Sequence, residues 1–193
     1  MRFAFALIVS IASIGGAMAA RAQIKAQLPT APITPVWDKG IQPINRDSYW
    51  NAVECGKQGG ARPLCVFYDA DLCRNDDFTL ALFTPYKQVA YEVWQAVRKR
   101  QDAPTPSFAD AQRTRITIGV TLASGSKNPI TAVSIKRGSR VVKPATQSLE
   151  GGGGKFIFDF AAFAPTEDIT IELVGRSRTE TCLVERAVLT RFR

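Results

Sequence analysis

Alternation of apolar and polar side chains over residues 114–193 is the feature that most restricts the fold of this chain. A period of two is typical of strands that bury one face, and turn sequences such as "RGSR" and "GGGG" separate the successive runs. The alternating positions are Ile116, Ile118, Val120 and Leu122, then Val133 and Ile135, Phe156, Phe158 and Phe160, Ile169, Ile171 and Leu173, and finally Cys182, Val184, Val188 and Phe192. Short strands at this spacing predict a mainly β fold with some α, built around an antiparallel, immunoglobulin-like β-sandwich.

A period of three to four residues marks a helix before this sandwich. Thr84 is a good N-cap and Pro85 suits the first helical position. The apolar stripe that follows comprises Tyr86, Val89, Ala90, Val93, Trp94 and Val97. A stripe of this width has to be buried, so we expect Val89, Val93, Trp94 and Val97 to lie between this helix and the sheet.

Weaker signals precede that helix. Asp47 can cap a helix in "SYWNAVEC", "LCVFY" at 64–68 reads as a short strand, and "FTLALF" at 78–83 reads as a strand or its lead-in. Together these patterns divide the chain into a signal peptide (1–22), a proline-rich extended leader (23–44), a helical N-terminal segment (45–102), a linker (103–113) and the β-sandwich domain (114–193).

The first residues of the chain predict export. Arg2 precedes the apolar run "FAFALIVSIASIGGAM", and small residues follow it, so cleavage after Ala20 or after Ala22 fits. A membrane anchor is the alternative, but the run is short for a bilayer span of about 20 residues. We therefore expect a periplasmic or secreted protein with no transmembrane segment after signal cleavage.

The four cysteines, Cys55, Cys65, Cys73 and Cys182, predict disulfides, because an even number in an exported chain is typical of cross-links. Zinc binding is the alternative, but the C-x-x-C spacing of zinc sites is missing. Four cysteines allow three pairings. We expect Cys55–Cys65, because the glycine-rich "GKQGGARPL" between them can reverse the chain, and Cys73–Cys182, which would tie the helical segment to the sandwich.

The composition removes several kinds of chemistry. The chain has no histidine, which excludes Ser-His-Asp and Cys-His mechanisms and histidine-ligated metals. Oxidised cysteines supply no thiolate nucleophile, and neither "GSKNP" nor "GGGG" has the spacing of a phosphate-binding loop. We therefore expect no cofactor, no metal and no catalytic residues, and an enzyme is the less favoured reading.

The acidic stretch "YDADLCRNDDF" at 68–78 leaves two other possibilities open. Its aspartates are Asp69, Asp71, Asp76 and Asp77. They could bind calcium, although the EF-hand pattern fails at three positions, or form an acid–base pair in a hydrolase. The alternative is an aspartate-rich turn beside a cross-link.

Two basic turns are the candidate binding residues. They are Lys136, Arg137, Arg140 and Lys143 at the first turn and Arg176 and Arg178 at the second, in a chain with a net charge of +8. Clustered cations could contact an anionic envelope polymer or a protein partner, whereas nucleic acid is not expected.

The sequence thus favours an exported, non-enzymatic binding or scaffold protein of unknown ligand. The alternative is an exported hydrolase that uses the aspartates, possibly with calcium.

Overall fold

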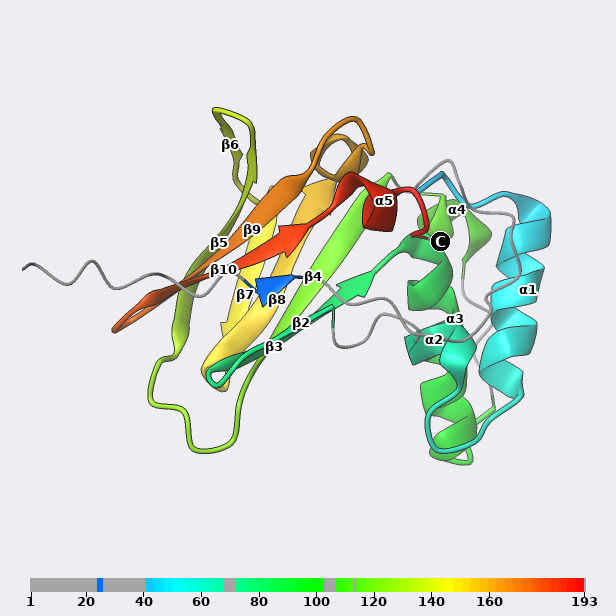
Figure 1. Cartoon of the computed structure of the whole chain (residues 1–193). Coiled ribbons are helices and arrows are strands. Elements are labelled where there is room, and N and C mark those ends of the chain that lie inside the picture. Colours follow the sequence, from blue (N-terminus) through cyan, green and yellow to red (C-terminus); the bar gives the residue numbers. More distant parts are fainter. Residues whose placement is uncertain (1–23, 26–40, 68–71, 103–106, 113, 193) are drawn as a thin grey trace, which may run out of the picture.

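The computed structural model describes residues 24–25, 41–67, 72–102, 107–112 and 114–192. Over these residues the chain forms two antiparallel sheets packed face to face, with helices gathered on one side (Figure 1). Sheet A has the order β1 (Ile24–Lys25), β10 (Thr179–Val184), β9 (Ile169–Gly175), β5 (Ile130–Arg137) and β6 (Arg140–Val142). Sheet B has the order β2 (Cys73–Arg74), β3 (Phe78–Phe83), β4 (Arg115–Leu122), β8 (Gly153–Asp159) and β7 (Thr146–Glu150). All pairings are antiparallel except that of β1 with β10, which is parallel.

The core between the two sheets is made of the alternating residues, and the predicted antiparallel sheet fold is confirmed. Ile118 in β4 and Phe156 in β8 are paired neighbours, and both are fully buried. The largest buried aromatic side chains of this core are Phe78, Phe156, Phe158, Phe163 and Phe192. The finer description as immunoglobulin-like stays a prediction.

The end of the chain departs from the predicted strand. β10 stops at Val184, and a short helix, α5 (Arg186–Leu189), follows it. The Asp168 carboxylate accepts a hydrogen bond from the Arg186 N–H at 2.7 Å, which holds the start of this turn. Val184, Val188 and Phe192 are spaced by four residues, and this spacing fits a helix as well as a strand. All three side chains are buried as expected, although a helix carries the later part. Phe160 likewise begins a 3₁₀ helix, η1 (Phe160–Phe163), after β8.

The helices have a hydrophobic core of their own. α1 (Arg46–Lys57), α2 (Leu64–Phe67), α3 (Pro85–Arg98) and α4 (Phe108–Ala111) enclose it on the right of Figure 1. Asn45, rather than Asp47, caps α1, accepting from Ser48 N–H at 2.8 Å. Thr84 caps α3 as predicted. "LCVFY" was wrongly predicted as a strand, because Leu64–Phe67 form α2.

The partner of α3 also differs from the prediction. Val89, Val93 and Trp94 are buried, but they pack against α1 and α2 rather than against the sheet, and Val97 is only partly buried. Gly56 of α1 makes this close approach possible. A Cβ at Gly56 would lie 2.5 Å from Ala90 O. Sheet B contacts α3 at the end of β3, where the centroids of the Phe83 and Tyr91 rings are 5.5 Å apart.

Both predicted disulfides are present. Cys55–Cys65 joins α1 to α2, and Cys73–Cys182 joins β2 of sheet B to β10 of sheet A. The second bridge therefore links the two sheets, whereas we expected it to link the helical segment to the sandwich. The reason is that residues 73–83, which we had placed in the helical segment, supply β2 and β3 to sheet B.

Candidate functional site

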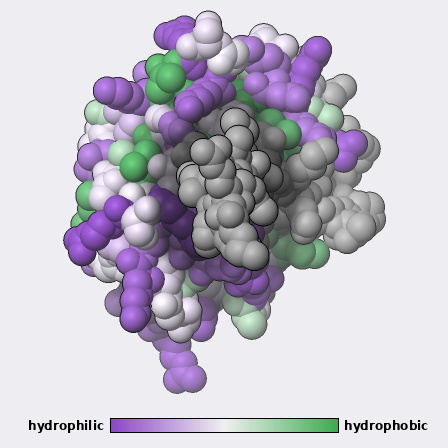
Figure 2. All heavy atoms as spheres, turned by 60° about the vertical axis from the view of Figure 1, so that its left-hand side comes forward, coloured by the Kyte–Doolittle hydropathy of each residue, from purple (hydrophilic) through white to green (hydrophobic). Residues whose placement is uncertain are grey.

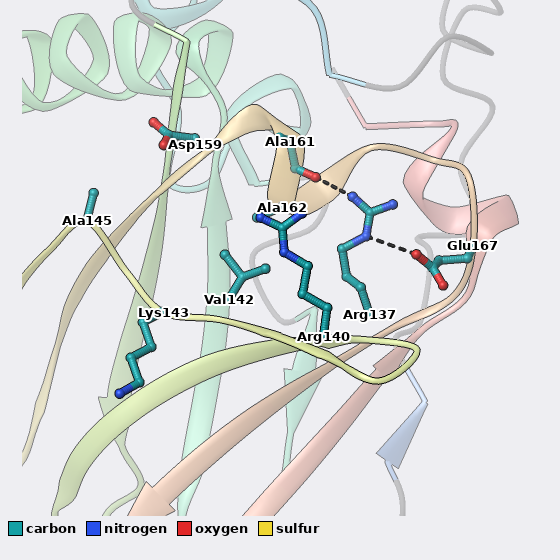
Figure 3. A pocket seen from close by; sticks show the side chains of 9 residues that line it. All are labelled: Arg137, Arg140, Val142, Lys143, Ala145, Asp159, Ala161, Ala162 and Glu167. Atoms are coloured by element: carbon teal, nitrogen blue, oxygen red, sulfur yellow. Dashed lines mark hydrogen bonds and ion pairs between the residues drawn. The ribbon is translucent and has the colours of Figure 1, made fainter.

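A pocket of about 530 Å³ opens where the chain passes from sheet A to sheet B (Figure 3). Its walls come from the β5–β6 hairpin, the crossover at residues 143–145, the end of β8 and η1. The lining residues are Arg137, Arg140, Val142, Lys143, Ala145, Asp159, Ala161, Ala162 and Glu167. Three of the predicted basic residues, Arg137, Arg140 and Lys143, thus share one pocket.

The register of β5 and β6 explains why two arginines face the end of the sandwich. Ile135 is fully buried in the core and lies opposite Val142, and Arg137 lies opposite Arg140. Paired residues of an antiparallel ladder share a face, and side chains two positions apart share it as well. Arg137 and Arg140 therefore point to the same side as Ile135. Gly138, with a φ of 51°, allows the tight turn between them.

Arg137 is held by the protein itself. Its Nε lies 3.3 Å from the Glu167 carboxylate, and its terminal nitrogens donate to Ala161 O, to Ala164 O at 3.2 Å and to the Thr166 hydroxyl. The side chain is only 13% exposed. This guanidinium holds η1 and the loop after it against β5, and four hydrogen bonds engage all three of its nitrogens.

Arg140 and Lys143 differ from Arg137 because both are exposed and neither side chain has a hydrogen bond or ion pair with another described residue. In Figure 3 the Arg140 guanidinium extends towards Ala162, across the pocket, whereas Lys143 points away from it at the rim. Val142, Ala145 and Ala162 supply small or apolar walls. Arg140 therefore offers a free planar donor group beside an apolar wall, a geometry suited to a carboxylate or phosphate.

The remaining basic residues lie elsewhere. Lys136 points to the opposite face of β5 and pairs with Glu172 at 2.9 Å. Arg176 and Arg178 follow β9, beyond Gly175, which is the partner of Ile130 at the start of β5. They are thus at the opposite end of β5 from the pocket, and the two predicted basic turns do not form one surface.

The acidic stretch has a structural centre at Asp77. This buried carboxylate accepts from the Ser126 hydroxyl at 2.7 Å, from the Asn128 amide at 2.9 Å and from Arg178 Nε at 2.6 Å. Burial raises the pKa of Asp77, but the hydrogen bonds from these three side chains outweigh it and the pKa lies below its ordinary value. A carboxylate engaged in this way holds loops together and is poorly placed to act as an acid or base.

Asn128 extends the same network, and sequence reasoning missed it. Besides donating to Asp77, its side-chain oxygen accepts from Ser177 N–H and from the Ser177 hydroxyl, both at 2.9 Å. Asn128 belongs to the segment "GSKNP", in which the chain crosses from β4 of sheet B to β5 of sheet A. The loop is therefore a joint between the sheets rather than a free tip.

The calcium and acid-pair hypotheses receive no support from the described residues. No group of three or more His, Cys, Asp or Glu side chains among them could hold a metal ion. Asp76 is exposed and Asp77 is engaged as above. Asp69 and Asp71 lie outside the described residues.

A buried lysine was also missed. Lys87 is 1% exposed, and its Nζ donates to Leu82 O at 2.6 Å, where β3 leads into α3. Burial lowers its pKa to about 7. It lies in the first turn of α3, three residues after the Thr84 cap, and the sequence reads there as an ordinary solvent-facing lysine.

Comparison of the chain with family models, with curated proteins and with solved structures gives no match. Within the described ranges no helix is long and apolar enough to cross a membrane. The candidate site is therefore argued from its own geometry.

Proposed function

We propose that this is an exported, non-enzymatic binding protein that takes an anionic ligand into the pocket at the β6–β7 crossover. The observation that carries the proposal is the state of Arg140. Its guanidinium reaches across the pocket without an acidic partner among the described residues, while Arg137 beside it already makes four hydrogen bonds to Glu167 and to residues 161–166. Arg140 would bind the anion directly, and Lys143 would add positive charge at the rim.

The proposal of export rests on the signal-like first residues and on the disulfides. Disulfides persist in oxidising compartments and are rare in the cytosol. The Cys73–Cys182 bridge joins the two sheets of the sandwich, and Cys55 and Cys65 staple two helices. One disulfide in the helical core and one between the two sheets support a periplasmic or secreted location.

Binding is favoured over hydrolysis because neither a cysteine thiolate nor a histidine is available to act on a substrate. All four cysteines are in disulfides, and the chain has no histidine. The side of the molecule on the left of Figure 1 is largely hydrophilic over its described residues, with separate small hydrophobic areas (Figure 2). That surface favours a charged ligand rather than an apolar one.

The test is charge reversal at the pocket. The Arg140→Glu/Lys143→Glu variant should lose its retention on heparin, used as a polyanion probe, at low salt. The matched control is Lys127→Glu/Arg176→Glu, which changes the net charge equally at exposed positions near the opposite end of β5. It should stay bound, and both variants should keep the melting temperature of the parent.

The two variants separate a site from a general charge effect. If both elute at the same reduced salt concentration, retention follows net charge alone and the pocket is not the site. If neither changes, the anion binds elsewhere. Either result overturns the proposal.

A further inference from the structure

The strand that follows the pocket is an open sheet edge. β7 pairs with β8 on one side, and no described strand pairs with its other side. All five of its residues, Thr146–Glu150, are exposed, and Leu149 is 50% exposed. An edge strand has a row of backbone N–H and C=O groups that can pair with another chain.

The inner face of β7 is open as well. Gln147 lies opposite Phe156 and Leu149 lies opposite Gly154, so both point to the face that Phe156 uses in the core. Phe156 is fully buried, whereas Gln147 and Leu149 are exposed. The short strand β6, Arg140–Val142, is the edge of sheet A on this side. Sheet A thus leaves β7 uncovered.

The usual protection of an edge is weak here. Natural edge strands are blunted by lysine, proline, bulges or inward charges. β7 contains no lysine or proline, its pairing with β8 has no register shift, and its single charge is Glu150 at the far end. The near end follows directly on the crossover that carries Lys143.

We propose that the ligand of the pocket is an extended acidic peptide that adds to β7 as a further strand and places a carboxylate on Arg140. This inference rests on the proposed function, and it names the ligand class. Charge complementarity orients the peptide. Arg140 and Lys143 attract acidic residues at the Thr146 end, and Glu150 repels them at the other.

The geometry of a strand gives the peptide a pattern. Side chains alternate faces with a rise of about 3.4 Å per residue. The acidic residue and an apolar residue that rests on Leu149 should share the inner face, and so they should be an even number of positions apart. Backbone pairing supplies affinity in such strand additions, and the side-chain contacts supply selectivity.

The test uses synthetic peptides of about eight residues with this pattern, labelled at one end, and fluorescence anisotropy with the full mature chain. Two further peptides carry backbone N-methyl groups on alternate residues, in one phase or in the other. A strand uses only one of its edges to pair with β7. We therefore expect one methylated peptide to lose at least about tenfold in affinity and the other to bind as the parent does.

Protein variants complete the test. Arg140→Glu should abolish peptide binding. Leu149→Ser, at an exposed position, should weaken it several-fold without changing elution from heparin. Equal binding of both methylated peptides, or no peptide binding by a protein that heparin still retains through Arg140, overturns the strand model but leaves the anion site intact. Retention on heparin that is unchanged by Arg140→Glu overturns both proposals. A β7-dependent dimer that excludes the peptide would also overturn the inference.

Discussion

Arg178 Nε lies 2.6 Å from Asp77 Oδ2, and this pair stands four residues from the Cys73–Cys182 disulfide on each of the two chain segments. Residues 73–77 and 178–182 are thus tied twice, once by a covalent bond and once by a buried carboxylate. The two ties connect sheet B to sheet A at one end of the sandwich. They account for Asp77 of the acidic stretch and for Arg178 of the second basic turn.

The first prediction compares the two disulfides. In the chain-entropy model the loop closed by a bridge determines its contribution, and the sequence separations are 109 residues for Cys73–Cys182 and 10 for Cys55–Cys65. Replacing Cys73 and Cys182 by serine should lower the free energy of unfolding by about 5 kcal/mol, against about 3 kcal/mol for Cys55 and Cys65. Urea unfolding of both double variants measures this order, and a reversed order would contradict the prediction.

The second prediction concerns Asp77. Asp77→Ala removes a carboxylate that accepts three side-chain hydrogen bonds and leaves the buried Asn128 amide short of a partner. We expect a loss of about 2 to 3 kcal/mol. Asp76→Ala, at the exposed neighbouring position, should change the free energy of unfolding by less than about 0.5 kcal/mol. Equal effects of the two changes would show that the network contributes nothing specific.

The third prediction concerns the pH dependence of the same carboxyl group. The pKa of Asp77 is lower in the folded chain than in the unfolded chain. The contribution of Asp77 to the free energy of unfolding is therefore complete above the pKa of this group in the unfolded chain, about 3.9. It is lost as the pH falls through the lower pKa of the folded chain. Asp77→Asn, measured by thermal melts from pH 6 to pH 2, should show a smaller loss of stability below pH 4 than the parent. Parallel curves would contradict it.

The fourth prediction concerns the core of the helices. Trp94 is 6% exposed, and its indole N–H donates to Gly60 O at 3.0 Å, whereas Trp50 on α1 is 51% exposed. Trp94→Ala should cost about 3 to 5 kcal/mol, and Trp50→Ala less than about 1 kcal/mol. Urea midpoints compare the two. A Trp94 variant with an unchanged midpoint would place this side chain outside the core.

The sequence predicted the elements with a clear period better than it predicted their partners. Ile116, Ile118 and Phe156 were assigned correctly because one buried face leaves a period of two. The stripe on α3 was also correct, but its partner is α1, since periodicity reports which face is buried and not what covers it.

One residue of the site could have been predicted from the alternation of buried and exposed positions along β5. Arg137 follows Val133 and Ile135 on the same face of β5, so an arginine at the end of a buried row could have been recognised. The sequence could not show that Arg137 is hydrogen-bonded within the protein whereas the Arg140 side chain has no partner among the described residues. That difference depends on Glu167 and on Ala161 O, which come from the loop after η1 and from η1 itself, more than 20 residues further along the chain.

The last prediction concerns Lys87, whose pKa is lowered to about 7 by burial at the start of α3. In the unfolded chain a lysine titrates near 10.4. Between pH 7 and about 9.5 the unfolded chain therefore holds a proton at this site that the folded chain has lost. The free energy of unfolding should rise with pH across this range, with a slope of up to about 1.4 kcal/mol per pH unit from this residue.

The Lys87→Met variant isolates that contribution, because it keeps the apolar stem and removes the titrating group. It also removes the hydrogen bond to Leu82 O, and below pH 7 this loss is constant because Lys87 is protonated in both the folded and the unfolded chain. The free energy of unfolding of both proteins is measured in urea at several pH values between 6 and 9.5. The difference between parent and variant should be constant below pH 7, and above pH 7 the parent should become steadily more stable relative to the variant. If the difference is constant throughout, Lys87 keeps its proton in the folded protein and a counter-charge must compensate its burial.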